Sequence, residues 1–173
     1  GDLVHPVDGV IAQAGNVSDE KLLQAKGWSY SLSELLGNSE LASSLEGGQF
    51  VTYYLCPTDY HRVHSPADLS LLSVRHIPGT LWPVNAASVS WVKNLFLLNE
   101  RVVFEFESVF GPMALVMVGA TNVGKISCSV GPPDWVSNSS HVKEPREESY
   151  ETGSIRVKSG QELGVFHMGS TVI

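Results

Sequence analysis

The sequence is poor in cysteine, in long apolar runs and in basic residues, and each shortage excludes a class of protein. Its two cysteines, Cys56 and Cys128, are 128 − 56 = 72 positions apart and have no CxxC partner, which argues against a disulfide framework and a thiolate zinc site. No apolar run reaches the roughly 18 residues of a membrane-spanning helix. The sequence therefore predicts no transmembrane segment.

Positive charge is also scarce. The chain has 11 Lys and Arg against 18 Asp and Glu, a net charge of −7, which argues against nucleic-acid binding and against electrostatic binding to anionic lipid. Only 17% of the 173 residues are charged and 43% are apolar, a balance typical of a packed domain. We therefore expect one domain over residues 1–173.

Short strands separated by turn residues dominate the pattern. Eight segments rich in Val, Ile, Phe and Leu predict β-strands: 10–14, 50–55, 69–77, 101–107, 113–120, 123–130, 154–157 and 163–172. Ser31 and Glu34 form a capping-box pattern for a short helix that ends at Gly37, and apolar spacing predicts a second helix over 86–98. Residues 131–150 are expected to form an exposed loop. The fold class predicted is α+β, mostly β, with a few short helices.

The densest group of reactive side chains is Asp59-Tyr60-His61-Arg62-Val63-His64. In an extended segment, residues three apart point to opposite faces, so His61 and His64 are expected to have different neighbours and different roles. A metal site shared by the two histidines is less natural in this arrangement than on a helix. Two ordinary packed histidines remain the alternative.

A carboxylate, a general base and a hydroxyl occur in the order Asp8, His64 and Ser170. Such a triad is defined by roles and geometry, and its members can come from distant segments. Asp8-Gly9 and Gly169-Ser170 are also common turn and loop sequences. The absence of a Gly-x-Ser-x-Gly elbow disfavours a standard α/β-hydrolase.

Six ordered blocks across nearly the whole chain give the sequence a family resemblance. They are His5-Pro6-Val7-Asp8-Gly9, Tyr60-His61-Arg62-Val63-His64-Ser65-Pro66, Pro78-Gly79-Thr80-Leu81-Trp82-Pro83-Val84-Asn85, Asn99-Glu100-Arg101-Val102, Val118-Gly119-Ala120-Thr121-Asn122-Val123-Gly124 and Gly169-Ser170-Thr171. In this combination the sequence resembles phosphatidylserine decarboxylases. The resemblance implies a barrel- or sandwich-like antiparallel β core and a lyase that makes phosphatidylethanolamine.

The resemblance also implies autocatalytic cleavage between Gly169 and Ser170. Ser170 would attack the Gly169 carbonyl, with His64 as base and Asp8 orienting it. A β chain would then end at Gly169 and an α chain would start at Ser170, and we expect sequence to be missing at both ends. Ser170 would become a pyruvoyl group that forms a Schiff base with the substrate, so that neither a metal nor pyridoxal phosphate is needed.

The remaining roles follow from the same resemblance. His61 is the candidate proton donor in decarboxylation, and Asp59 is given a supporting role. The expected partners are phosphatidylserine, membrane lipid, the chain's own α chain and a second copy in a homodimer. We expect peripheral association with a bacterial or mitochondrial inner membrane. The candidate lipid-facing side chains are Leu81, Trp82, Trp91, Leu95, Phe96, Leu97 and Leu98. For most of them, packing in the core from a helix is the alternative.

A different function remains open from the sequence. The segment Lys158–Gly164 resembles turns of lipoyl and biotinyl carrier domains and of phosphotransferase carriers, in which His64 or His61 would accept a group. No central Met-Lys-Met site for biotin is present. A carrier of this kind would also leave Gly169-Ser170-Thr171 without a role.

Overall fold

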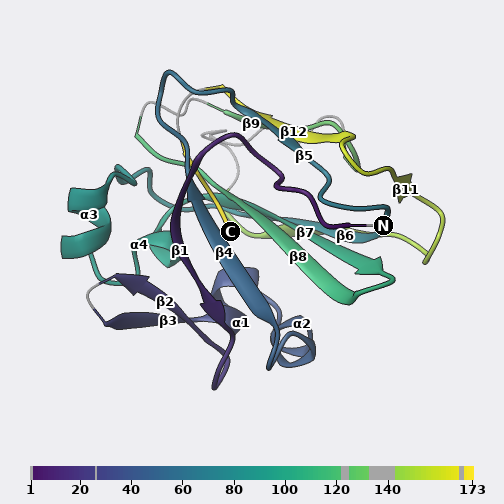
Figure 1. Ribbon diagram of the computed structural model, residues 1–173, viewed down its shortest axis with the longest axis horizontal. Coiled ribbons are helices and arrows are strands. Elements are labelled where there is room, and N and C mark those ends of the chain that lie inside the picture. The colour runs from purple at the N-terminus through teal and green to yellow at the C-terminus, as the bar shows by residue number, and fades with distance from the viewer. Residues whose placement is uncertain (1, 26, 122–124, 133–142, 168–169) are drawn as a thin grey trace.

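The computed structural model describes residues 2–25, 27–121, 125–132, 143–167 and 170–173. Most of the strands form one large antiparallel sheet, with a three-stranded sheet on one side and the β2–β3 hairpin with helices α1 and α2 on the opposite side (Figure 1). The described strands form open sheets rather than a closed barrel. The mostly-β α+β class predicted from the sequence is confirmed.

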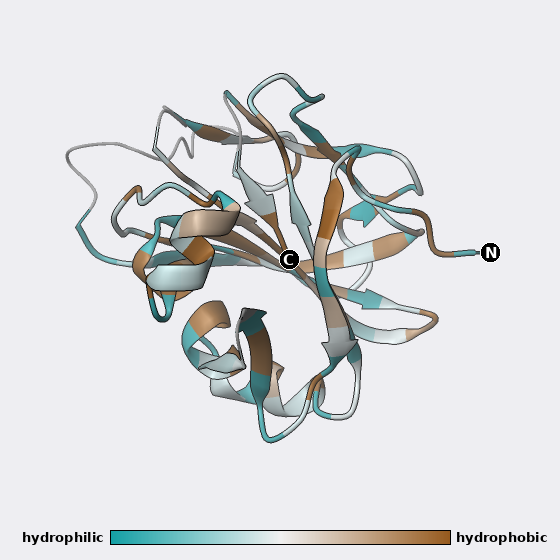
Figure 2. Cartoon of the chain, turned by 60° about the vertical axis from the view of Figure 1, so that its left-hand side comes forward, coloured by the Kyte–Doolittle hydropathy of each residue, from teal (hydrophilic) through white to brown (hydrophobic). Residues whose placement is uncertain are grey.

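The large sheet has the order β1-β4-β13-β8-β7-β6-β10, and β11 also pairs with β6. Its strands are β1 (Val10–Asn16), β4 (Gln49–Tyr54), β6 (Leu69–Ile77), β7 (Arg101–Ser108), β8 (Gly111–Val118), β10 (Arg146–Ser149), β11 (Arg156–Val157) and β13 (Thr171–Val172). The central strands β6 and β7 are largely buried. Along the strands, hydrophobic segments (brown) are interspersed with hydrophilic ones (teal), as Figure 2 shows. Buried polar side chains such as Ser73, Arg75 and His76 interrupt the apolar residues of β6.

Two smaller sheets complete the fold. One has the order β5-β12-β9, from β5 (Arg62–His64), β12 (Glu162–Phe166) and β9 (Ile126–Cys128). The other is the hairpin of β2 (Lys21–Ala25) and β3 (Trp28–Ser31). The predicted strand 163–172 is thus wrong as a single element, because its first half pairs in the small sheet and its end pairs in the large one.

Helix α1 (Leu32–Leu36) has the caps that its sequence predicts. The Ser31 hydroxyl accepts from the backbone N–H of Glu34 at 3.2 Å, and Gly37 ends the helix with a positive φ of 64°, a conformation that glycine adopts without strain. Helix α2 (Ser39–Ser44) follows at once, capped by Asn38. The sequence did not predict α2.

The predicted helix over 86–98 is broken in two. It forms α3 (Ala86–Trp91) and α4 (Leu95–Leu98). Residues 92–94 separate the two helices, and Val92 among them is extended. The buried Gln24 side chain crosses the break: its Nε2 donates to the carbonyls of Val89 and Val92, both at 2.8 Å, and its Oε1 accepts from the N–H of Leu95 at 3.2 Å. A distant side chain therefore satisfies the backbone groups that a continuous helix would pair.

The expected loop over 131–150 contains an edge strand. Residues Arg146–Ser149 pair with β6, and Glu147 binds the Arg75 guanidinium at 2.5 Å. Charged residues suit an edge strand because they discourage further strand pairing. Charged residues are also common in loops, and the composition of this segment therefore led to the prediction of a loop. Residues 133–142 lie outside the described part.

Candidate active site

Ser170 lies where the chain enters the large sheet. Its N–H donates to the carbonyl of Leu55 at 3.2 Å, and its carbonyl accepts from the N–H of Leu55 at 2.8 Å. The side chain is 0% exposed, and its hydroxyl has no hydrogen-bond partner among the described residues. A buried hydroxyl without a partner is uncommon and calls for an explanation, of which a catalytic role is one. Gly169, the other half of the predicted cleavage site, lies outside the described residues.

His64 lies at the end of β5 with both ring nitrogens engaged. Nδ1 is 2.9 Å from the carbonyl oxygen of Gly160, and Nε2 is 2.9 Å from the hydroxyl of Tyr60. The Tyr60 and His64 rings stack with centroids 5.6 Å apart and planes 8° apart. Because a carbonyl oxygen can only accept, Nδ1 carries the proton and neutral His64 has its lone pair on Nε2.

Asp8 and His64 line the same small cavity of about 230 Å³, together with Tyr60 and Gly160. Asp8 is exposed, and none of the hydrogen bonds of the described residues joins it to His64. Gly9 permits the close approach of this segment to β4, since a Cβ there would lie 2.8 Å from the carbonyl oxygen of Tyr54. The fold thus brings two members of the predicted triad together, whereas Ser170 is not among the residues that line this cavity.

His61 has a separate environment. Its Nε2 is 3.1 Å from the carbonyl oxygen of Pro57, so in the neutral ring the proton is on Nε2 and the lone pair on Nδ1. That Nδ1 is buried and has no hydrogen-bond partner among the described residues. The carbonyl of His61 accepts from the N–H of Phe166 at 2.9 Å, which ties this residue to β12. His61 and His64 therefore have different hydrogen-bond partners.

Asp59 closes the turn that precedes His61. One carboxylate oxygen accepts from the N–H of Cys56 at 2.7 Å, and the N–H of Asp59 donates to the carbonyl of Cys56 at 2.9 Å. This turn carries Pro57, whose carbonyl contacts His61. Asp59 thus supports the position of His61 through the backbone and makes no hydrogen bond to its ring within the described structure.

An ion pair flanks the cavity on the small sheet. Arg62 Nη1 is 2.5 Å from Glu162 Oε2. Glu162 lies opposite His64 in the strand register. Hydrogen bonds from Ser129 and then from Arg62 hold the pKa of Glu162 below its ordinary value. Glu162 is therefore a fixed negative charge near His64.

Sequence reasoning missed Tyr60 and Gly160 as partners of His64. Tyr60 lies in the same block, four residues before His64, and this short separation could have identified it as a neighbour of His64. Gly160 is 96 residues away in the sequence, and no local pattern identified it. Its turn is anchored by Asp68, which accepts from the N–H of Ser159 at 2.9 Å.

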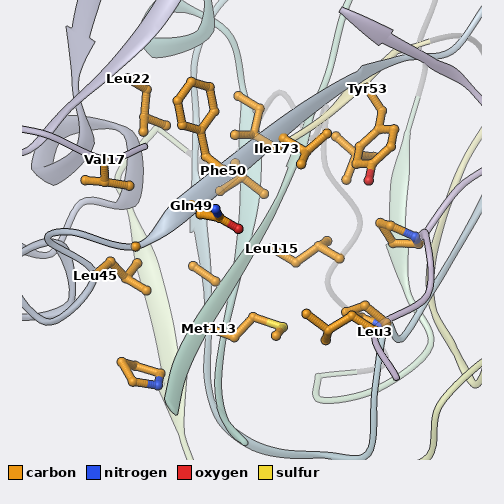
Figure 3. Close-up of a pocket in the computed structure, with 18 of the residues that line it drawn as sticks. Leu3, Val17, Leu22, Leu45, Gln49, Phe50, Tyr53, Met113, Leu115 and Ile173 are labelled. Atoms are coloured by element: carbon orange, nitrogen blue, oxygen red, sulfur yellow. The ribbon is translucent and has the colours of Figure 1, made fainter. Parts of the chain in front are cut away.

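A large apolar cavity of about 540 Å³ was also not predicted. Phe50 and Tyr53 of β4 and Met113 and Leu115 of β8 line it, with Ile173 beside them (Figure 3). Leu3 is also a lining residue. Val4, His5 and Pro6 line both this cavity and the small one, so an apolar space adjoins the cavity of Asp8 and His64.

The candidate lipid-facing side chains divide into three groups. Leu81 and Leu97 are half-buried. Leu95 and Phe96 are buried in the core, at 0% and 3% exposure, so for these two the core alternative is correct. They pack inward because α4 covers the core beside α1. Trp82, Trp91 and Leu98 are exposed. Within the described residues, no helix is long and apolar enough to cross a membrane.

The described residues contain no group of three or more His, Cys, Asp or Glu side chains arranged as metal ligands. The candidate site is instead built from a buried serine, two separately held histidines and a carboxylate.

The model of a protein family, described as phosphatidylserine decarboxylase, matches residues 1–173. Three curated relatives are each named phosphatidylserine decarboxylase proenzyme. Those of Anaeromyxobacter sp. strain K, Nitrosococcus oceani and Salmonella agona are 47%, 46% and 45% identical over 99% of this chain. The chain spans 60%, 56% and 54% of their respective lengths.

Proposed function

The chain belongs to the phosphatidylserine decarboxylase family, and on this premise we propose that it forms the catalytic body of an enzyme that converts phosphatidylserine to phosphatidylethanolamine and carbon dioxide. The observation that carries this proposal is the family match over residues 1–173, a span that includes Asp8, His64 and Ser170. The buried, unpartnered hydroxyl of Ser170 supports it.

The first reaction is cleavage of the chain by its own serine. Ser170 Oγ attacks the Gly169 carbonyl carbon, the peptide C–N bond breaks, and an ester and a free amine on residue 170 result. Elimination then removes the Cα proton of residue 170 and breaks its Cβ–O bond, which leaves the Gly169 carboxylate and dehydroalanine at position 170. Water converts this dehydroalanine to pyruvoyl and releases ammonia. The products are a β chain ending at Gly169 and an α chain beginning at residue 170.

His64 is the base for the first step. Its Nε2 holds the lone pair, because Nδ1 donates to the Gly160 carbonyl, and an imidazole accepts a proton readily near neutral pH. Asp8 lines the same cavity, and its negative charge favours the imidazolium that forms. The Gly160 carbonyl thus helps to orient the His64 ring, a role that the family resemblance gave to Asp8.

The pyruvoyl group supplies a conjugated carbonyl that accepts electrons as carbon dioxide leaves. The position of Ser170 fits such a group, since its buried oxygen has no partner among the described residues. His61 delivers the proton to the substrate carbon from its imidazolium form: Nδ1, which is buried and free of a partner within the described part, first takes up a proton and then gives it to the carbon, while Nε2 keeps its own proton on the Pro57 carbonyl. Asp59 holds the turn beside it. Neither a metal ion nor pyridoxal phosphate has a part in this scheme.

We also propose that the enzyme works at a membrane surface. Trp82 and Leu98 support the membrane contact: both are exposed, and the pairing of Thr80 with Asn99 brings their segments side by side. Exposed aromatic and aliphatic side chains are suited to the lipid interface. Flotation with phosphatidylserine liposomes is expected to weaken in Trp82→Ala, and unchanged flotation would argue against this surface.

The main test is the intact mass of the chain expressed with a tag after Ile173. We expect a break between Gly169 and Ser170 and a tagged fragment whose first residue has the mass of pyruvoyl. Release of labelled carbon dioxide from phosphatidylserine is then measured on the cleaved protein. An unbroken chain under native conditions would refute self-cleavage, and cleavage without decarboxylation would refute the assigned substrate.

A further inference from the structure

Tyr60 makes two distinct contacts with the ring of His64. The phenol ring stacks on the imidazole, 5.6 Å between centroids and 8° between planes, and the phenol hydroxyl is 2.9 Å from Nε2. Stacking restrains the orientation of the imidazole, whereas the hydroxyl occupies one specific nitrogen. The two contacts therefore have separable consequences.

The direction of the hydrogen bond follows from the other side of the ring. The Gly160 carbonyl at 2.9 Å requires the proton on Nδ1, so neutral His64 has its lone pair on Nε2. The Tyr60 hydroxyl must then donate to Nε2. In this structure the Nε2 lone pair, which would have to accept the proton of a serine, already accepts a hydrogen bond from the Tyr60 hydroxyl.

The Nδ1 contact does not depend on Tyr60. The turn that presents the Gly160 carbonyl is held by the carboxylate of Asp68, which accepts from the N–H of Ser159, and by the carbonyl of Ser65, which accepts from the N–H of Gly160 at 2.8 Å. Loss of the Tyr60 hydroxyl therefore leaves the tautomer of His64 unchanged and frees Nε2.

We propose that Tyr60 is a positioning residue with two opposing effects on self-cleavage: its ring orients His64, and its hydroxyl caps Nε2 until Ser170 replaces it. This inference rests on the proposed function. Ser170 Oγ has no partner among the described residues and is not among those that line the His64 cavity, so the proton transfer requires the serine hydroxyl to displace the phenol. The proton then moves from Ser170 Oγ to His64 Nε2, and Tyr60 keeps its own.

Two substitutions at one position separate these effects. Tyr60→Phe removes the hydroxyl and keeps the ring, and we expect it to cleave about twofold to tenfold faster than the parent chain, the equivalent of one ordinary hydrogen bond. Tyr60→Leu removes the stacking as well, and we expect it to cleave more slowly than Tyr60→Phe. Tyr150→Phe is the matched control, since the Tyr150 hydroxyl binds Glu148, and it should cleave at the parent rate.

The rates are measured by cell-free synthesis of the tagged chain with radiolabelled methionine and sampling of the cleaved fraction over time. Slower cleavage in Tyr60→Phe than in the parent would overturn the cap and would make the hydroxyl part of the proton transfer. Equal rates for the Phe and Leu variants would overturn the positioning role of the ring. Failure of the parent chain to cleave would instead count against the proposed function.

A spectroscopic measurement tests the contact without any reaction. In Ser170→Ala chains with ¹⁵N-labelled histidine, NMR should show that His64 is protonated at Nδ1 and that its Nε2 is unprotonated and accepts a hydrogen bond. Adding Tyr60→Phe should move the Nε2 resonance toward that of a free ring nitrogen and leave Nδ1 protonated. A proton on Nε2 in the Ser170→Ala chain, or an Nε2 resonance indifferent to Tyr60→Phe, would overturn the proposal.

Discussion

The start of β13 and the cavity around His64 hold their reactive groups in opposite ways. Ser170 is 0% exposed, and its hydroxyl has no hydrogen-bond partner within the described structure. His64 is half-buried beside an open cavity, and both of its nitrogens are engaged. The proposed nucleophile is buried away from solvent and has no hydrogen-bond partner among the described residues, whereas the proposed base lies beside a cavity and both of its nitrogens are hydrogen-bonded.

This difference shows what the fold supplies to each group. Insertion of β13 between β4 and β8 removes water from Ser170, which strengthens any electrostatic interaction the hydroxyl then makes. The turn at Gly160 determines the tautomer of His64. The proposed self-cleavage requires the two regions to meet, and substitutions that change one region alone should affect different steps.

Ser170→Ala removes the nucleophile and should have the largest effect. We expect no cleavage and no decarboxylation, because neither the ester nor the pyruvoyl group can form. Intact mass and lipid turnover measure the two losses. Ser44→Ala, at an exposed helical serine, is the control and should behave as the parent. Cleavage at the same bond in Ser170→Ala would end the assignment of the nucleophile.

His64→Ala removes the base while Ser170 stays in place. Cleavage should slow by about 10²- to 10⁴-fold, the usual contribution of a general base. The fraction cleaved is followed over time by mass spectrometry. His167→Ala is the control, because His167 is an exposed histidine that binds Ser127 and has no assigned role. A parent-like rate in His64→Ala would show that Ser170 is deprotonated by another group.

His61→Ala should separate cleavage from turnover. We expect normal cleavage, since His61 has its own partners and takes no part in that step, and a fall in decarboxylation of about 10²-fold from the loss of the proton donor. Both are measured on one preparation, so cleavage serves as the internal control for folding. Equal loss of both activities would place His61 in the first reaction as well.

Glu162→Gln should have the smallest effect, on stability. Because folding lowers the pKa of Glu162, its stabilisation is present above the unfolded carboxyl pKa of about 4.3 and is lost as pH falls through the folded value. The ion pair with Arg62 is partly exposed, so solvent screening keeps its contribution to stability small. Urea unfolding should show a small loss at neutral pH that vanishes in acid.

Glu151→Gln is the control for this measurement, since the Glu151 carboxylate has no ion pair among the described residues. A loss in Glu162→Gln that is equally large in acid would show that the carboxylate acts through its shape or hydrogen bonding. Its charge beside His64 would then be irrelevant to stability.

Local sequence signals predicted the elements that depend on neighbouring residues. The strand 69–77 matches β6 in full, and the helix between Ser31 and Gly37 has the predicted caps. The break between α3 and α4 was missed because it depends on Gln24, which is more than 60 residues away. Strands β2, β3 and β5 were missed because short segments carry little apolar periodicity.

The chemical groups and the family can be read from the chain alone: it carries a carboxylate, two histidines and a serine, and it matches the phosphatidylserine decarboxylase family over residues 1–173. The burial and hydrogen bonding of these groups depend on the fold. Burial of Ser170 depends on strands β4 and β8, and the tautomer of His64 depends on the carbonyl of Gly160, 96 residues away. Solvation and hydrogen bonding belong to surroundings assembled from distant segments, and no local pattern encodes them.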